Sequence, residues 1–395
     1  MVGEDAALTS YKRLFSRALA AAPERLHMAA HSHHLWPDAT RAAHIEAWDD
    51  AARLADRKWD KVLGEVWPRA QAGVARQLCL PSPDTIVFSS NTHDLILRLV
   101  SALARRPARI LTSDREFHSF RRQAARWSET GEVVLDVVNV EPFDTFGDRF
   151  LAAARAGGHD LIFVSHVFFD TGEILDRIGD LATLSSPSGP WVAIDGYHAF
   201  MAFPVDLSDV ADRIFYIAGG YKYAMAGEGA AFMHAPPGYG ARPAATGWYA
   251  EFAGLSGPPG KVVYADDARR FMGSTFDPSG IYRLAAVFDL LDRERLDTGL
   301  ITARIAPLRV DLADRIGRGE AGALGEAKLV ASQTRNPAAR FLSLRHPDAA
   351  RWQAALAAAD VTTDVRGEIL RIGLGLYHDP EDIQLFCAAA RQMPV

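Results

Sequence analysis

The sequence contains few cysteines and no long apolar run, and both absences exclude classes of protein. Cys79 and Cys387 are the only thiols in 395 residues, which rules out a disulfide framework and a thiolate zinc cluster. No hydrophobic run approaches the length that spans a bilayer, and the N-terminus lacks the basic and then apolar layout of a signal peptide. We therefore expect a reduced, cytoplasmic protein without membrane contact.

An excess of positive charge is also missing. Lys and Arg number 43 against 49 Asp and Glu, which gives a net charge of −6. No basic tail is present either, so nucleic acid is not an expected partner. Hydrophobic residues make up 49% and charged residues 23% of the chain, which is typical of a globular protein.

The chain has no internal repeat and no low-complexity tract. Apolar runs of strand length alternate instead with helical patterns from about 60 to 290, which predicts an α/β fold with a mostly parallel sheet covered on both faces. We expect three parts: an N-terminal segment (1–60) that packs on the small domain and lines the site, a large domain (61–290) and a smaller C-terminal α+β domain (291–395).

Residues 191–234 hold the two groups on which the functional interpretation depends. An apolar run from Trp191 ends on the carboxylate of Asp195, and a second run leads into a glycine-rich turn that contains Lys222. Enzymes that use pyridoxal 5′-phosphate (PLP) need a lysine of lowered pKa that binds the cofactor and an acid that keeps the pyridine nitrogen protonated. Taken alone, the pair is weak evidence, and a helix cap with a solvated loop charge is the favoured explanation of it.

The neighbours of this pair carry a resemblance to a known family. His198 follows Asp195 by three residues, and Tyr221 directly precedes Lys222 in a loop of small residues. This order resembles the class V aminotransferase family of fold type I, and most closely kynureninase. The resemblance implies a seven-stranded-type sheet and a PLP cofactor contacted by Lys222, Asp195, His198 and Tyr221.

The segment Ser89-Ser90-Asn91-Thr92 follows a predicted strand and begins a helical pattern. Free N–H groups and the helix dipole favour an anion at such a position, although a plain N-cap explains the segment equally well. The resemblance implies phosphate binding by Asn91, Thr92 and His93. Asp94 departs from the family pattern, and we expect its side chain to point away from a phosphate dianion.

Aromatic residues follow two further predicted strands. The resemblance implies that Phe117 stacks on the pyridine ring, with a role in the core as the alternative, and that Ser119 contacts the cofactor. Phe168 and Phe169 stand where related desulfurases carry an asparagine that can reach the phenolic oxygen of the cofactor. This departure weakens a desulfurase interpretation.

Three histidines cluster at His31, His33 and His34, just before Trp36 and a proline. His31 and His33 would share one face of an extended chain. No acid or cysteine with ligand spacing accompanies them, so an ordinary polar loop is favoured over a metal site. The resemblance offers a third interpretation, in which this segment lines the substrate pocket with His33 and Trp36.

The C-terminal half supplies three more candidates. The resemblance implies that Trp248 comes close to the phosphate, and that a segment with Thr275 approaches the site from the partner subunit of a homodimer. Arg371 lies inside an apolar strand, where it either forms a buried ion pair or awaits the carboxylate of a ligand. The family uses an arginine at this position to clamp the amino-acid substrate.

The resemblance implies hydrolysis of kynurenine, or of a related γ-carbonyl amino acid, to alanine and an aromatic acid such as anthranilate. Tyr221 would act as acid or base at the γ-carbonyl. The alternatives are transamination and a desulfurase-like or lyase-like reaction on a small amino acid. Between Ala321 and Arg371 there is no cysteine, which argues against persulfide chemistry on the protein. A cofactor-binding regulator is a further possibility, because fold does not fix function.

Overall fold

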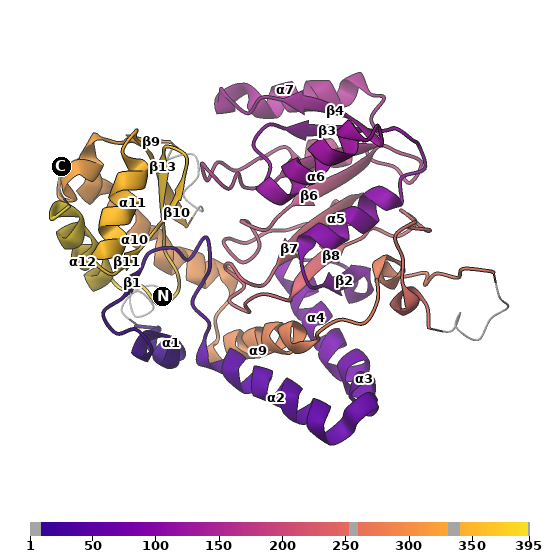
Figure 1. Cartoon of the computed structure of the whole chain (residues 1–395), viewed down its shortest axis with the longest axis horizontal. Helices are drawn as coiled ribbons and strands as arrows, with labels where there is room; N and C mark the ends of the chain where they lie inside the picture. Colours follow the sequence, from indigo (N-terminus) through magenta and orange to yellow (C-terminus); the bar gives the residue numbers. More distant parts are fainter. Residues whose placement is uncertain (1–8, 253–259, 331–339, 394–395) are drawn as a thin grey trace.

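The structure is a computed structural model that describes residues 9–252, 260–330 and 340–393. Figure 1 shows a large domain beside a smaller C-terminal one, with α9 (Ser279–Glu294) and α10 (Thr298–Gly317) running from the first to the second. None of the helices formed by the described residues is long and apolar enough to cross a membrane.

The large domain is built on a seven-stranded sheet. Its strand order is β2-β8-β7-β6-β5-β3-β4, and β8 runs antiparallel to both of its neighbours while the other pairs are parallel. The expected mostly parallel α/β sheet is confirmed. The strand bounds are Ile86–Ser89 (β2), Ala108–Ser113 (β3), Val133–Val138 (β4), Leu161–Ser165 (β5), Trp191–Asp195 (β6), Ile214–Gly219 (β7) and Ala231–His234 (β8).

Helices pack against this sheet because the central strands are buried along their whole length and need cover from water. Helix α5 contacts β2, β7 and β8, while α6 contacts β4 and α8 contacts β6. The helices are α4 (Trp67–Gln77), α5 (Thr92–Ser101), α6 (His118–Glu129), α7 (Phe143–Ala156) and α8 (Ile178–Ala182).

The small domain contains a four-stranded sheet in the order β12-β13-β10-β9. Its strands pair antiparallel and are covered by helices. The elements are β9 (Lys328–Leu329), β10 (Phe341–Arg345), α11 (Ala349–Ala358), β12 (Asp364–Arg366), β13 (Ile369–Gly373) and α12 (Pro380–Arg391). Asp379 forms a capping box with Asp382 at the start of α12.

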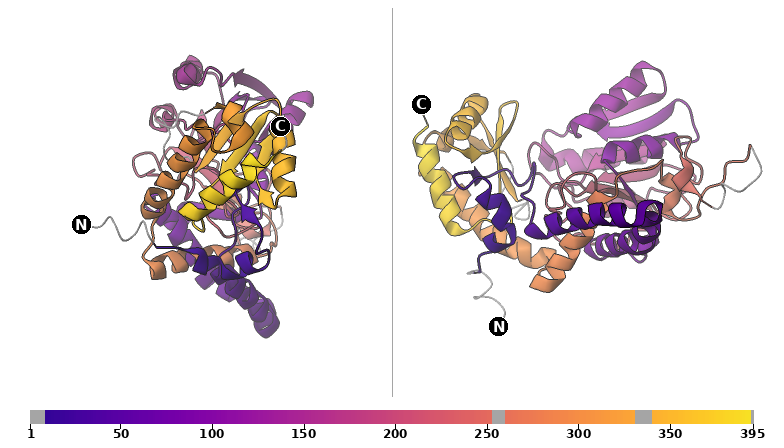
Figure 2. Two further views of the ribbon diagram at one scale, coloured as in Figure 1. Left: turned by 90° about the vertical axis from the view of Figure 1, so that its left-hand side faces the viewer. Right: turned by 60° about the horizontal axis from the view of Figure 1, so that its bottom comes forward.

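The N-terminal segment joins both domains. Its strand β1 (Leu26–His27) pairs in parallel with β11 (Val361–Thr362) of the small domain. After the short helix α1 (Ser16–Ala20), strand β1 and a loop, α2 (Asp38–Leu54) packs along α9, and α3 (Lys58–Lys61) follows. The right-hand view of Figure 2 shows this indigo segment running from the small domain to the large one.

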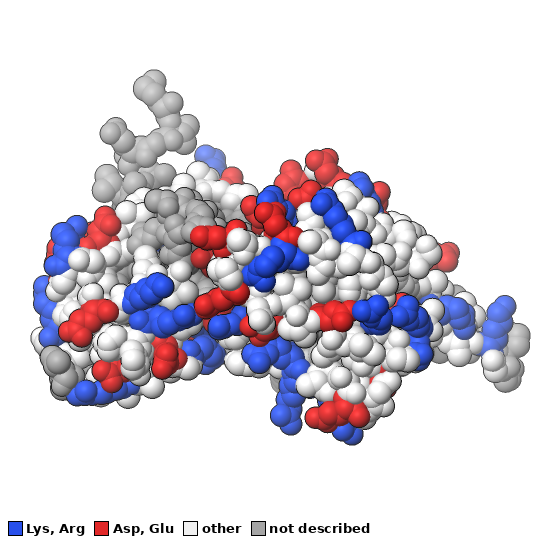
Figure 3. All heavy atoms as spheres, turned by 90° about the horizontal axis from the view of Figure 1, so that it is seen from above, with Lys and Arg blue, Asp and Glu red and all other residues white. Residues whose placement is uncertain are grey.

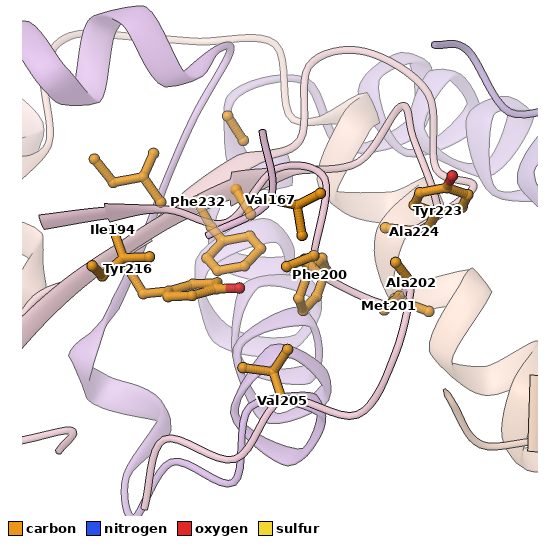
Figure 4. Close-up of a cluster of buried hydrophobic side chains, with 14 of the residues drawn as sticks. Val167, Ile194, Phe200, Met201, Ala202, Val205, Tyr216, Tyr223, Ala224 and Phe232 are labelled. Carbon is orange, nitrogen blue, oxygen red and sulfur yellow. The ribbon is translucent and has the colours of Figure 1, made fainter. Parts of the chain in front are cut away.

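A tightly packed apolar cluster lies beneath the ends of β6 and β7. Figure 4 shows Phe200, Phe232 and Tyr216 gathered beside Ile194 on the strand that ends at Asp195. Gly196, the next residue, allows Tyr216 to approach, since a Cβ there would lie 2.0 Å from Tyr216 Cζ. This packing fixes the strand end that carries the acid.

The surface carries charges of both signs. On the face shown in Figure 3, Lys and Arg side chains are interspersed with Asp and Glu, without a continuous field of one sign. This distribution agrees with the small net negative charge of the chain.

Candidate active site

Asp195 and Lys222 lie at the carboxyl ends of neighbouring strands. Asp195 is the last residue of β6 and pairs with Ile217 of β7, and Lys222 follows three residues after β7 ends. The Oδ1 atom of Asp195 accepts a hydrogen bond of 3.0 Å from the Tyr197 N–H. Burial raises the pKa of Asp195, while this hydrogen bond and the positive charge of Lys222 oppose the rise.

Lys222 is 4% exposed and its ammonium group lies among aromatic rings. Its Nζ is 4.6 Å from the ring centre of Tyr197 and 5.4 Å from that of Phe117. Burial lowers its pKa to about 7, although Asp195 acts in the opposite direction. A substantial fraction of this lysine is therefore neutral near pH 7, as a nucleophile or base requires.

A cavity of about 1480 Å³ brings many of the predicted residues together. Asp195 and Lys222 do not line it themselves, but their chain neighbours Tyr197 and Tyr221 do. Its wall includes Phe117 and Ser119 from the start of α6, and both Tyr197 and Tyr221. The Phe117 ring also meets the edge of Phe169, with ring centres 5.5 Å apart. The aromatic wall suits a flat heterocycle.

The predicted phosphate segment lines the same cavity with Asn91, Thr92 and His93. The Asn91 side chain caps α5 by accepting a hydrogen bond of 2.9 Å from the Asp94 N–H, so the plain N-cap is present as well. The Nδ1 atom of His93 is buried without a hydrogen-bond partner. A phosphate at the start of α5 would find this donor and the helix dipole.

Asp94 does not line this cavity. Its carboxylate accepts hydrogen bonds from the hydroxyls of Ser89 and Ser90, at 3.4 Å and 3.2 Å. The Asp94 carboxylate is thus bound to the loop before α5, away from the predicted phosphate position. We expected this orientation from the sequence.

His198 is buried close to the lysine, and its Nδ1 has no hydrogen-bond partner. Burial lowers the pKa of its imidazole well below the usual value, and Lys222 and Arg371 lower it further. A neutral ring with one free nitrogen can bond a phenolic oxygen, a contact that Phe168 and Phe169 cannot provide.

The histidine cluster does not share one face, and that expectation is wrong. The chain turns at residues 30–33, so that His31 is fully buried against the Phe341 ring, 4.8 Å away. His33 is exposed and stacks on Tyr221, with ring centres 4.9 Å apart. Among the described residues, no group of three His, Cys, Asp or Glu side chains could hold a metal ion.

Trp36 packs on the loop that follows Lys222. A Cβ at Gly227 would lie 2.2 Å from Trp36 Cζ2, and Gly227 has a φ of +71°, so glycine is required on both counts. Trp36 and His33 therefore cover the lysine loop from outside. The backbone supports this cover, because the His34 N–H donates to the Tyr221 carbonyl at 3.0 Å.

Trp248 and Thr275 contact each other but do not line the cavity within the described part of this chain. The indole Nε1 donates to Thr275 Oγ1 at 3.3 Å, and Trp248 is 45% exposed. The structure therefore does not bring them to the site of their own subunit. A contribution to a partner's site stays a prediction.

Arg371 is buried in β13 and is already paired. Its Nη2 donates to Asp364 Oδ2 and its Nη1 to the Phe169 carbonyl, while Nε has no partner. Asp364 lies directly opposite Arg371 on β12, and its Oδ1 accepts from Arg366 at 2.9 Å. The ion-pair alternative is thus present in the structure.

Sequence reasoning missed two acids, Asp364 and Glu116. Glu116 is fully buried between the hydroxyls of Ser113 and Ser165, each 2.5 Å from a carboxyl oxygen. Burial raises the pKa of Glu116 to about 8. Its position in a polar turn gave no signal of burial, whereas the alternation of Asp364 and Arg366 before Arg371 could have revealed the Asp364 cluster.

Comparison with known proteins agrees with this geometry. The family model for aminotransferase class V matches residues 57–325. The chain belongs to the class V aminotransferase family. No curated protein matches the chain by sequence.

Solved structures similar to this class V chain cover almost all of it. One is a mutant of C-DES with glycine covalently linked to its PLP cofactor (TM-score 0.79, 16% identity, 98% of this chain and 100% of that chain). Others are cysteine desulfurase from Thermococcus onnurineus NA1 (0.75, 16%, 98% and 98%) and the desulfurase CsdA from Escherichia coli (0.74, 15%, 93% and 94%). Fold type I is thereby confirmed, whereas kynureninase-type specificity is not.

The class V chain is a PLP-dependent enzyme, and its residues fit the cofactor. Lys222 has the lowered pKa that attachment requires, and Asp195 lies at the adjacent strand end. The unpartnered nitrogens of His93 and His198 are free to bond the phosphate and the phenolic oxygen. The bound cofactor supplies an electron sink for the pair released at Cα.

Proposed function

We propose that this enzyme is a β-lyase that cleaves the bond between Cβ and sulfur in an amino acid such as cystine. The observation that carries the proposal is a lysine-acid pair whose neighbours Tyr197 and Tyr221 line a cavity without a thiol in its wall among the described residues. The structural neighbours support it, because one of them is the cystine C-S lyase C-DES in complex with its product cysteine persulfide.

Neutral Lys222 would take the proton from Cα, since its lowered pKa keeps a substantial fraction of the lysine unprotonated near pH 7. The Cβ–S bond then breaks, and the sulfur leaves with the electron pair as a thiolate or, from cystine, as a persulfide. Water converts the remaining unsaturated amino acid to pyruvate and ammonia. Arg371 would hold the carboxylate during these steps.

A desulfurase that carries sulfur on its own cysteine is not favoured. Cys79 is exposed at the end of α4, and Cys387 is buried in α12 of the small domain. Neither lines the cavity. Elimination requires no protein thiol, because the sulfur leaves the substrate directly as a thiolate or persulfide.

Hydrolysis of a γ-carbonyl amino acid is the second candidate, and the aromatic wall favours it. Phe117, His118 and Tyr221 line the cavity and Phe169 borders Phe117, so that a flat side chain would be well covered. Tyr221 would serve as acid at the γ-carbonyl. Burial raises the pKa of its hydroxyl to about 12, which keeps it protonated.

The test is a product assay with the PLP-loaded protein. We expect pyruvate and a persulfide from L-cystine, and no product with Lys222→Ala as the control. L-kynurenine and 3-hydroxykynurenine are assayed in parallel for the fluorescence of anthranilate and 3-hydroxyanthranilate. An amino-acid and keto-acid panel tests for amino-group exchange. Anthranilate without pyruvate would identify the enzyme as a hydrolase, and amino-group exchange without pyruvate would identify it as an aminotransferase.

A further inference from the structure

The guanidinium of Arg371 has no pair of nitrogens that a carboxylate could take without competition. Both terminal nitrogens donate to acceptors of the protein, Asp364 and the Phe169 carbonyl. A carboxylate that binds arginine through two parallel N–H bonds uses at least one terminal nitrogen. A substrate carboxylate therefore meets an internal carboxylate at the same group.

The hairpin geometry places Asp364 in this position. Strands β12 and β13 pair antiparallel with Asp364 opposite Arg371, so both side chains project from the same face. Arg366 lies two residues after Asp364 and shares that face. It binds the other carboxyl oxygen at 2.9 Å.

The charges of this cluster leave room for one more acid. Arg371 and Arg366 contribute two guanidinium groups, whereas Asp364 contributes one carboxylate. Burial lowers the pKa of Arg371 and the Asp170 carboxylate opposes this shift, but Asp170 is paired with Arg115 at 2.8 Å. His31 has its Nε2 3.8 Å from Asp364, but burial lowers the pKa of its imidazole well below the usual value, so it adds no charge near pH 7. A ligand carboxylate would give each arginine one acid.

We propose that Asp364 is an internal ligand of Arg371 that competes with a substrate carboxylate and is held by Arg366 when the ligand is bound. This inference rests on the clamp role of Arg371 in the proposed function. It applies equally to a lyase, a hydrolase and an aminotransferase. Its consequence is a lower affinity for carboxylate ligands in general, because each must bind beside, or in place of, the buried carboxylate of Asp364.

The experiment compares Asp364→Asn with wild-type holoenzyme, using L-alanine and acetate as probes. Binding is followed through the visible absorbance of the bound cofactor for L-alanine, and by competition with L-alanine for acetate. We expect both dissociation constants to fall roughly tenfold to hundredfold, the range for one charge-assisted hydrogen bond. Glu368→Gln, which removes an exposed acid at the turn of the same hairpin, is the matched control and should change neither value.

Arg366→Gln provides a test of opposite sign. Without Arg366, the carboxylate of Asp364 has only Arg371 as an arginine partner and should bind it more firmly. The dissociation constant for L-alanine should therefore rise. The melting temperature gives a readout that is independent of turnover. L-alanine should raise it more for Asp364→Asn than for wild type. In the ligand-free variant the charge of Arg371 has no carboxylate partner, whereas in wild type Asp364 provides one.

Two outcomes would overturn the inference. If Asp364→Asn binds L-alanine no more tightly than wild type, Asp364 only positions Arg371. If Arg366→Gln binds L-alanine more tightly than wild type, Arg366 does not hold Asp364 when the ligand is bound. Failure of the proposed function is distinguishable. In that case L-alanine would leave the wild-type spectrum unchanged, and Arg371→Lys would bind it no differently.

Discussion

Tyr221 and His33 lie ring against ring, with centres 4.9 Å apart and planes 20° from parallel. The contact joins the N-terminal segment to the residue that precedes the cofactor lysine. It also leaves the Tyr221 side chain on the wall of the cavity. The position of this tyrosine makes it the residue that best separates the two candidate reactions.

Tyr221→Phe should spare elimination and abolish hydrolysis at a γ-carbonyl. Release of a thiolate requires no acid from the protein, so pyruvate formation from cystine should change by only a few fold. A lost general acid would lower kcat for anthranilate formation by roughly 10²- to 10⁴-fold. Steady-state assays of both products on one preparation compare the two effects. Equal losses in both would contradict the separation of roles.

Lys222→Ala should abolish covalent attachment of the cofactor. The purified wild-type protein is expected to be yellow and to retain PLP through dialysis, because Lys222 is the buried amine beside Asp195. The variant should lose its visible absorbance under the same treatment. Borohydride reduction followed by peptide mass spectrometry identifies the modified residue. A PLP adduct on another lysine would refute the assignment.

Arg371→Lys keeps the charge but loses the planar fork that matches two oxygens. If Arg371 clamps the substrate, kcat/KM should fall roughly tenfold to hundredfold, or about 1.5–3 kcal/mol, with cofactor absorbance unchanged. Arg345→Lys is the matched control, since Arg345 forms an exposed ion pair with Glu141 at the end of β10. An intact KM combined with a lower melting temperature would identify Arg371 as a structural ion pair only.

The stability of the cofactor-free protein should depend on pH through Lys222. Its folded pKa of about 7 lies below the ordinary value of 10.5, so the unfolded chain binds more protons between these values and stability rises with pH there. Replacing the lysine removes the loss of stability that its buried, protonated form causes at low pH. The melting temperature of Lys222→Met minus that of wild type should be most positive below pH 7 and vanish towards pH 10.5.

The exposed lysine Lys261 provides the control for that measurement. The difference between Lys261→Met and wild type should not vary with pH over the same range. A flat difference curve for Lys222→Met would mean that its pKa is not lowered in the folded protein.

Trp248 and Thr275 should complete the site of a partner subunit in a homodimer. Heterodimers of Lys222→Ala and Trp248→Ala subunits would then contain one site without either substitution and should recover part of the activity. Heterodimers of Lys222→Ala with the double variant Lys222→Ala/Trp248→Ala contain no intact site and serve as the control. No recovery in verified heterodimers would argue against shared sites.

The sequence predicted the position of Asp195 and Lys222 because both follow apolar strands that end at one edge of a parallel sheet. His31 and His33 were placed on one face because the segment was taken as extended, whereas a turn at residues 30–33 separates them. The burial of Glu116 depends on two serines from different strands, Ser113 and Ser165. Such contacts arise only when distant segments meet, so local pattern cannot reveal them.

The pairing of Leu26 with Val361, and of Ala29 with Gly373, has a consequence for the order in which the protein is made. The ribosome synthesises the N-terminal segment first, yet its β-sheet partners follow every strand of the large-domain sheet in the chain. The pairings of this segment with β11 and with Gly373 of β13 can therefore form only after both strands have been synthesised. All strands of the large-domain sheet precede β11 and β13 in the chain, so the N-terminal segment pairs with the small domain after those strands have been made.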